Sequence, residues 1–119
     1  MTFDRLQRMV ADFTTDRAWE NFHTPKNLVM ALTGEVGELS ELFQWLTAEQ
    51  SQVIMETPSQ RARVEDEVAD ILIYLLRLAD VLEIDLGDVV EAKVQKNADR
   101  YPVSKVYGRA VKYTEIDSE

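Results

Sequence analysis

The sequence has no cysteine, which excludes a disulfide framework, a thiol nucleophile and thiolate metal ligands. Its single histidine, His23, is not part of a Glu-x-x-His motif, and this excludes a carboxylate-bridged di-iron bundle. The chain also has no Ser/His/Asp grouping, so we do not expect a covalent intermediate on a side chain. Any hydrolysis must therefore use water as the nucleophile.

Long apolar runs and blocks of positive charge are absent as well. No apolar run approaches the roughly 20 residues that a membrane span needs, so we expect no membrane association. The N-terminal residues lack the apolar core of a signal peptide, which favours a cytoplasmic location. The net charge of −9, without a Lys/Arg block, disfavours a nucleic-acid polymer as partner. Small nucleotides remain possible ligands through a metal ion.

Helical spacing of apolar residues predicts an all-α fold, and 119 residues are enough for one domain. Thr2, Thr24, Thr57 and Asp85 are candidate N-caps, and Tyr101-Pro102 is a stop signal. We expect four main helices in an antiparallel bundle, over residues 2–18, 25–46, 58–82 and 85–101. A capping box of Thr47 and Gln50 predicts a short connecting helix to residue 55. Residues 103–119 are predicted to be a C-terminal tail that docks on a partner or on the ligand.

Two acidic pairs are the strongest chemical signal. Glu35-x-x-Glu38 and Glu67-x-x-Asp70 each place two carboxylates on one face of a helix whose apolar residues commit it to a core. Bringing four like charges together near apolar surface is costly unless a cation intervenes. Oxygen ligands without His or Cys suit Mg²⁺, with Mn²⁺ as a substitute. The alternative is that these acids are ordinary exposed residues of an acidic protein.

The fourth predicted helix offers donors for phosphate. Lys93, Asn97 and Arg100 recur at i, i+4 and i+7, so they share one face of the helix. Arginine binds phosphate oxygens with two parallel hydrogen bonds, and lysine binds them as a point charge. The alternative is a solvent-facing stripe.

Aromatic side chains near the acidic pairs could bind a nucleobase. Stacking on aromatic rings is worth roughly 1–3 kcal/mol per base in single-strand binders. The candidates for base contact, with an amide and the lone imidazole beside them, are Trp19, Phe22, His23, Asn27, Trp45 and Tyr74. Trp45 is expected to continue the Glu38 face of the second helix, and Tyr74 the Asp70 face of the third. The alternative for these aromatics is a place in the core or in an interface.

The acidic pattern, together with several local segments, resembles the all-α MazG-like nucleoside triphosphate pyrophosphohydrolases, and within them the dCTP pyrophosphatase branch. The segments that carry this resemblance are 19–28, 34–45, 70–75, Asn97-x-x-Arg100-Tyr101-Pro102 and 112–115. They follow the family order along nearly the whole chain. Val10 departs from the pattern, because vertebrate relatives are expected to carry a polar residue there.

The resemblance implies a Mg²⁺-dependent hydrolase that converts a dNTP to the dNMP and pyrophosphate, with dCTP or a modified dCTP preferred, in nucleotide-pool house-cleaning. The arrangement of the carboxylates itself favours Glu35 or Glu38 as the general base that takes a proton from the attacking water. The resemblance implies metal ligands at Glu35, Glu38, Glu67 and Asp70, and phosphate contacts from Lys93, Asn97 and Arg100. It also implies a homotetramer, a dimer of dimers, whose sites borrow from neighbouring chains. An excess of large apolar residues independently favours a homo-oligomer.

Two other functions remain open. One is a non-enzymatic helical module that dimerises through its acidic helices and needs no metal. The other is a pyrophosphohydrolase acting on a different (d)NTP.

Overall fold

The computed structural model describes residues 1–117, and every regular element in that part of the chain is helical. The prediction of an all-α protein is therefore confirmed. None of the helices in the described part is both long and apolar enough to cross a membrane. The chain divides into one compact unit, Met1–Glu83, and a second that starts at Ile84. The expectation of one domain over residues 1–119 stays a prediction, as does the placement of a fourth helix in one antiparallel bundle.

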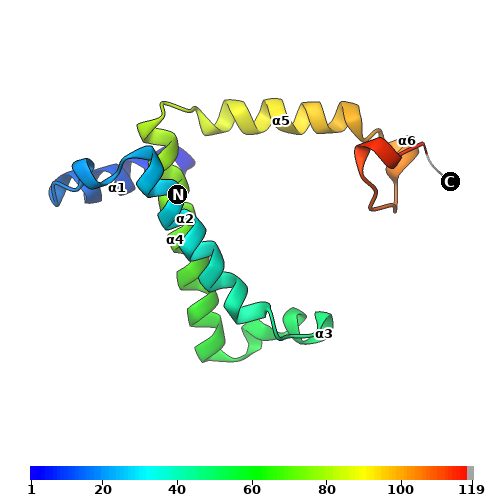
Figure 1. The fold of residues 1–119 in the computed structure, drawn as a ribbon, viewed down its shortest axis with the longest axis horizontal. Helices are drawn as coiled ribbons and strands as arrows, with labels where there is room; N and C mark the ends of the chain where they lie inside the picture. The colour runs from blue at the N-terminus through cyan, green and yellow to red at the C-terminus, as the bar shows by residue number, and fades with distance from the viewer. Residues whose placement is uncertain (118–119) are drawn as a thin grey trace. The chain divides into compact units, whose positions relative to one another are not determined.

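The first unit is built on two long helices, α2 (Pro25–Phe43) and α4 (Pro58–Val81). They run antiparallel and side by side (Figure 1), joined by the short helix α3 (Ala48–Gln52) and a 3₁₀ turn, Ile54–Glu56. Helix α1 (Phe3–Asp16) also packs on α4. A second 3₁₀ turn, Glu20–Phe22, connects α1 to α2.

The predicted helix starts are largely confirmed. The Thr2 and Thr24 hydroxyls each accept a hydrogen bond from the backbone N–H three residues on, at 3.2 Å. Thr47 and Gln50 make both bonds of the capping box, at 2.9 and 3.1 Å. Thr57 makes no side-chain cap hydrogen bond, contrary to expectation. Its helix begins instead with Pro58, whose fixed φ and missing N–H suit the first helical position.

The end of α2 differs from the prediction and moves Trp45. The helix ends at Phe43, and the Leu46 N–H bonds to the Phe43 carbonyl at 2.9 Å in a tighter turn. The chain must leave the helix here because Thr47 needs extended backbone, with ψ of 166°, to cap α3. The predicted extension of α2 to residue 46 is therefore wrong. Trp45 lies in the turn and not on the helical face of Glu38.

A left-handed residue ends α1 and sets the position of Trp19. Ala18 has φ of 52°. The Ala18 N–H bonds to the Thr15 carbonyl at 3.0 Å, and the Trp19 N–H to the Thr14 carbonyl at 3.1 Å. This is the Schellman arrangement, in which glycine is usual because a Cβ is strained at positive φ.

The core of the first unit is small. Its buried apolar side chains include Leu28 from α2, and Val64, Leu76 and Ala79 from α4. Many large apolar side chains in the described part remain exposed, among them Phe3, Met9, Phe13, Phe22, Met30, Val36 and Val68. Apolar surface of this extent is typical of proteins that associate.

The second unit contains α5 (Leu86–Arg100), the short helix α6 (Val103–Val106) and a 3₁₀ turn, Tyr113–Glu115. The Asp85 carboxylate caps α5 as predicted, accepting from the Asp88 N–H at 3.0 Å. Of the residues predicted as a tail, 103–117 fold back locally, since Ile116 is 5% exposed and its carbonyl accepts from Arg109 at 3.2 Å, and 118–119 lie outside the described residues. Helix α5 itself has no buried side chain. Whether this segment docks on a partner or ligand stays a prediction.

We expect Ala18→Gly to stabilise the protein by about 0.5–1 kcal/mol, because glycine removes the strain at positive φ and loses only part of that gain to its greater freedom when unfolded. The matched control is Ala11→Gly inside α1, which should destabilise by about 1 kcal/mol. Urea unfolding of both variants measures the two effects. Equal destabilisation by both would contradict the assignment of strain to Ala18.

Candidate metal centre and adjoining cleft

Three carboxylates converge where α2 faces α4. Glu35 and Glu38 lie one turn apart on α2, and Glu67 comes from α4. Each offers an oxygen, and these oxygens all lie within 4.8 Å of one another. Glu35 and Glu67 are half-buried and Glu38 is exposed. The antiparallel packing of two helices thus brings together three of the four carboxylates that the spacing predicted.

The donor atoms of this cluster fit a hard divalent cation. Glu35 Oε2 and Glu67 Oε2 are buried and have no hydrogen-bond partner within the described part of the chain. Leaving a buried polar atom unpaired costs roughly 1–3 kcal/mol, and more for a charged group. A cation bound by these oxygens would remove that penalty. Carboxylate oxygens without sulfur or nitrogen ligands suit Mg²⁺ or Mn²⁺.

The acidic cluster raises the pKa of Glu35. The pKa of Glu35 rises from its ordinary value of 4.5 to about 7. The largest cause is the close Glu67 carboxylate, which can share a hydrogen bond with Glu35 only when a proton lies between them. Burial and the nearby Glu38 act in the same direction, and the charge of Asp70 adds a smaller effect. Without a cation, the raised pKa therefore keeps Glu35 of the folded protein protonated up to about pH 7.

Asp70, the fourth predicted ligand, occupies a different place. It is not one of the three converging carboxylates, although its charge reaches Glu35. Asp70 instead lines an adjoining cleft of about 210 Å³. It therefore links the acidic cluster to this cleft.

The cleft contains three of the predicted base-binding residues. Its walls come from α1, the segment between α1 and α2, and α4, with the lining residues Val10, Phe13, Thr14, Trp19, His23, Asp70, Ile73, Tyr74 and Arg77. The rings of Phe13 and Trp19 meet edge to face, with centroids 5.8 Å apart. The cleft is smaller than the roughly 300–1,000 Å³ of sites that enclose a drug-sized ligand. Its size suits a single ring.

The other three predicted base-binding residues do not line this cleft. Phe22 is 67% exposed and Trp45 is 86% exposed. The Asn27 side-chain amide donates to the Phe22 carbonyl at 3.1 Å and so holds the turn before α2. Their roles in base binding stay predictions.

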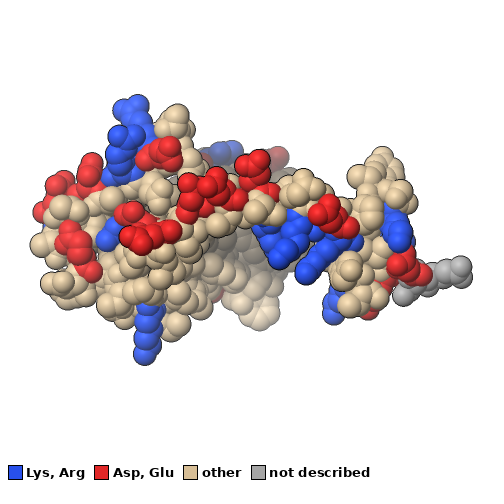
Figure 2. All heavy atoms as spheres, turned by 90° about the horizontal axis from the view of Figure 1, so that it is seen from above, with Lys and Arg blue, Asp and Glu red and all other residues tan. Residues whose placement is uncertain are grey.

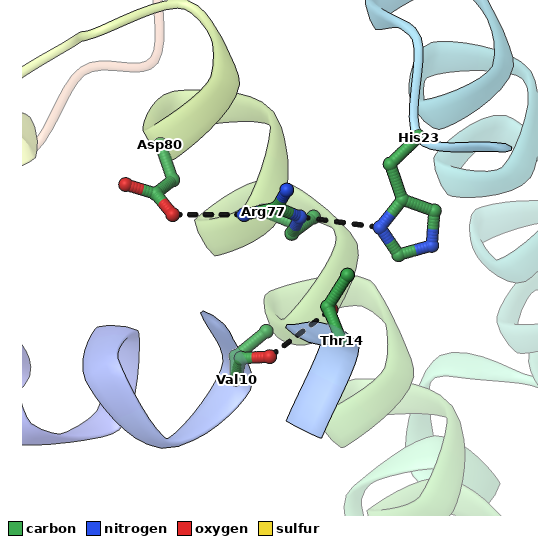
Figure 3. A network of polar contacts seen from close by, with 5 residues as sticks. All are labelled: Val10, Thr14, His23, Arg77 and Asp80. Carbon is green, nitrogen blue, oxygen red and sulfur yellow. Dashed lines mark hydrogen bonds and ion pairs between the residues drawn. The ribbon is translucent and has the colours of Figure 1, made fainter. Parts of the chain in front are cut away.

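Sequence reasoning missed Arg77, which lies in a polar network at the cleft (Figure 3). Its Nε donates to His23 Nδ1 at 3.2 Å, and its Nη1 contacts Asp80 Oδ2 at 2.8 Å. Burial lowers the pKa of His23, the positive charge of Arg77 lowers it further, and Glu20 opposes both. A signal for Arg77 existed, because it continues the helical face of Asp70 and Tyr74 by one more turn.

The predicted phosphate ligands lie in the second unit. Lys93, Asn97 and Arg100 are all exposed on α5. Figure 2 shows acidic side chains near the start of this helix and basic ones gathered toward its end. The Arg100 guanidinium lies 5.5 Å from the centre of the Tyr113 ring. Their approach to a substrate stays a prediction.

Comparison with known proteins bears directly on this site. Residues 31–116 match the model of the MazG-like family, a range that includes all four predicted metal ligands. The chain is 45% identical to dCTP pyrophosphatase 1 of Bos taurus and 43% identical to that of Homo sapiens, over 97% of this chain and 68% of each relative. It also resembles the crystal structure of a pyrophosphatase from Archaeoglobus fulgidus DSM 4304, with a TM-score of 0.77 and 40% identity, covering 83% of this chain and 91% of the other.

In metal-free protein, we expect the free energy of unfolding to fall as the pH rises from about 4.5 to 7. Within this window folded Glu35 keeps its proton while unfolded Glu35 loses it, so the native state binds more protons and loses stability with rising pH. The contribution is complete below pH 4.5 and is lost as the pH passes 7. Urea midpoints in the presence of a chelator measure this trend.

Glu35→Gln should flatten the trend and raise stability at pH 8. Glu49→Gln, which changes a carboxylate outside the cluster, should leave the trend intact. The same slope in wild type and Glu35→Gln would show that Glu35 titrates normally.

Proposed function

The chain belongs to the MazG-like family, and on that premise we propose that it is a Mg²⁺-dependent nucleoside triphosphate pyrophosphohydrolase. It hydrolyses a deoxynucleoside triphosphate between the α- and β-phosphates, releasing the monophosphate and pyrophosphate. The preferred substrate is dCTP or a modified dCTP, in keeping with the names of its mammalian relatives. Its role is removal of unwanted nucleotides from the pool.

The convergence of Glu35, Glu38 and Glu67 is the observation that carries this proposal. Three carboxylates with two unpaired buried oxygens are unfavourable in a folded protein unless a cation is bound. We assign these residues, with Asp70 at the edge of the cleft, to metal binding. When bound, Mg²⁺ neutralises charge that develops on the phosphates and lowers the pKa of a coordinated water.

In this proposal a carboxylate of the cluster takes the proton from the attacking water. Glu35 and Glu38 project from one face of α2 into the cluster, so either can accept the proton of the attacking water. The chain lacks cysteine, and no Ser/His/Asp group lies in the cluster, so direct attack by water accounts for the reaction.

The cleft beside Asp70 is the proposed base site. Trp19 and Tyr74 supply aromatic surface for stacking, and His23 lies in the same wall. Because Asp70 belongs to the cleft and also affects Glu35, a base held there brings its phosphates toward the carboxylates. Phe22 and Asn27 hold the turn that carries His23. The small volume favours a pyrimidine over a purine.

The remaining site residues fit a homo-oligomer. Trp45 is almost fully exposed in the turn after α2, which suits a contact with the base site of a neighbouring protomer. Val89, Val90 and Val94 on α5 are exposed, so this helix has an apolar face to bury. Lys93, Asn97 and Arg100 would contact phosphates in such an assembly. We propose the tetramer, a dimer of dimers, expected from the sequence; the cytoplasmic location also stays a prediction.

A non-enzymatic dimerisation module, the alternative from the sequence, would also bury the exposed apolar side chains, but a homo-oligomeric enzyme does so equally well. Such a module gives no reason for the unpaired buried oxygens of Glu35 and Glu67, and the pyrophosphatase relatives favour the enzyme. A panel of deoxy- and ribonucleoside triphosphates, with phosphate and pyrophosphate measured separately, tests the proposal. We expect pyrophosphate as the product and dCTP as the best substrate. Fastest turnover of a purine or ribonucleotide would overturn the dCTP assignment. No turnover of any triphosphate would overturn the proposed pyrophosphohydrolase activity.

Loss of an outer-shell partner costs a metal site up to about 100-fold. Because Glu67 is proposed as a direct ligand, we expect Glu67→Gln to lower Mg²⁺-dependent turnover by at least that factor. The helical fold should persist, because the substitution removes a charge and leaves the packing face of α4 unchanged. Glu65→Gln is the matched control on the same helix, since its exposed carboxylate pairs with Arg61. Full activity in Glu67→Gln at saturating Mg²⁺ would contradict the carboxylate site.

A further inference from the structure

The Arg77 side chain is held by two polar contacts. Asp80, one turn along α4, contacts Nη1 at 2.8 Å, and His23 accepts from Nε at 3.2 Å from a separate segment of the chain (Figure 3). The Arg77 side chain is 11% exposed, compared with 55% for Arg61 on the same helix. The Arg77 side chain is thus already ordered in the folded protein, so binding a ligand would cost little additional side-chain entropy.

The two contacts leave part of the guanidinium unused. Arginine has five N–H donors, and within the described residues one Nε and one Nη1 hydrogen bond account for two of them. The Nη2 groups and the second Nη1 hydrogen make no other hydrogen bond to a described residue. Neutral His23 adds no competing charge, because burial and Arg77 both lower its pKa. Arg77 therefore keeps unused N–H donors on a guanidinium held by two contacts, and the residue lines the cleft.

The other walls of the cleft are mostly apolar or aromatic, from Phe13, Trp19, Ile73 and Tyr74. Thr14 is 2% exposed and its hydroxyl donates to the Val10 carbonyl at 3.1 Å. Apolar and aromatic walls hold a flat ring without distinguishing one base from another. Discrimination must come from the few polar groups at the cleft, and Arg77 supplies the fixed donors.

We propose that Arg77 is a specificity-determining residue, which donates hydrogen bonds to the adjacent carbonyl oxygen and ring-nitrogen acceptors of a cytosine base in the cleft. Cytosine carries these two acceptors, O2 and N3, side by side. Thymine and uracil carry an N–H at the same ring position, which would face the Arg77 donors and leave them unpaired. This assignment rests on the proposed function and adds to it the residue that separates cytosine from the other pyrimidines.

The competing explanation is purely structural. Arg77 ties the segment that contains His23 to α4, so its loss could lower stability without any effect on base choice. A structural role predicts that dCTP and dTTP turnover fall together. A role in recognition predicts that the ratio between them changes.

The test compares Arg77→Met, which removes all donors, and Arg77→Lys, which keeps the charge beside Asp80 but loses the planar pair of N–H groups. We expect the ratio of kcat/KM for dCTP over dTTP to fall about tenfold or more in both variants, as expected for loss of a base-specific bidentate contact. Arg61→Met is the matched control, because Arg61 also pairs with a carboxylate on α4 but does not line the cleft. Its ratio should equal that of the wild type.

A second readout is independent of hydrolysis. The affinities for dCMP and dTMP, measured by calorimetry, should show the same loss of preference in the Arg77 variants. An unchanged ratio in both assays, or equal losses for both bases together with a lower melting temperature, would overturn the role of Arg77. If wild type binds dCMP over dTMP and the Arg77 variants do not, yet no triphosphate is hydrolysed, the proposed function fails while this inference stands.

Discussion

The mutual repulsion of carboxylates at the contact between α2 and α4 is the constraint on which the rest of the structure depends. Two helices could pack without placing Glu35, Glu38 and Glu67 within 4.8 Å of one another. Their convergence raises the pKa of Glu35 to about 7 and leaves two buried oxygens without partners. A folded chain tolerates this cluster most readily when a divalent cation is bound, so the packing of the helices and the proposed chemistry have one physical cause.

The cleft beside the acidic cluster is the proposed site of nucleobase recognition. Asp70 lines the cleft, and its charge acts on Glu35 in the acidic cluster. From Asp70 onward, the same face of α4 carries Tyr74 and then Arg77, so the residues proposed for metal binding, stacking and base discrimination follow one another along a single helix. The turn at Ala18, with its positive φ, comes directly before Trp19, which also lines the cleft. The proposed base site therefore depends on how α1 ends as well as on α4.

Local signals in the sequence were enough to predict the main helices and the acidic cluster. Thr24-Pro25 and the Thr47–Gln50 capping box act through backbone atoms a few residues away, and the Glu-x-x-Glu spacing follows from helical geometry. Trp45 was misplaced because Leu46 continues the apolar period of α2 beyond the point where the Thr47 cap interrupts the helix. The helical spacing of Asp70, Tyr74 and Arg77 was a local signal for the position of Arg77. Its hydrogen bond to His23 could not be predicted, because His23 is distant in sequence and meets α4 only after folding.

Binding of Mg²⁺ to the substrate-free protein tests the central claim most directly. A ligand that binds only the folded state raises its stability in proportion to the logarithm of the ligand concentration once the site is nearly saturated. The account predicts that millimolar Mg²⁺ raises the melting temperature of the wild-type protein at pH 8, and that Glu35→Gln loses most of this rise although its metal-free form is the more stable. A wild-type melting temperature that does not respond to Mg²⁺ or Mn²⁺, or an equal rise in both proteins, would contradict a metal site at Glu35, Glu38 and Glu67.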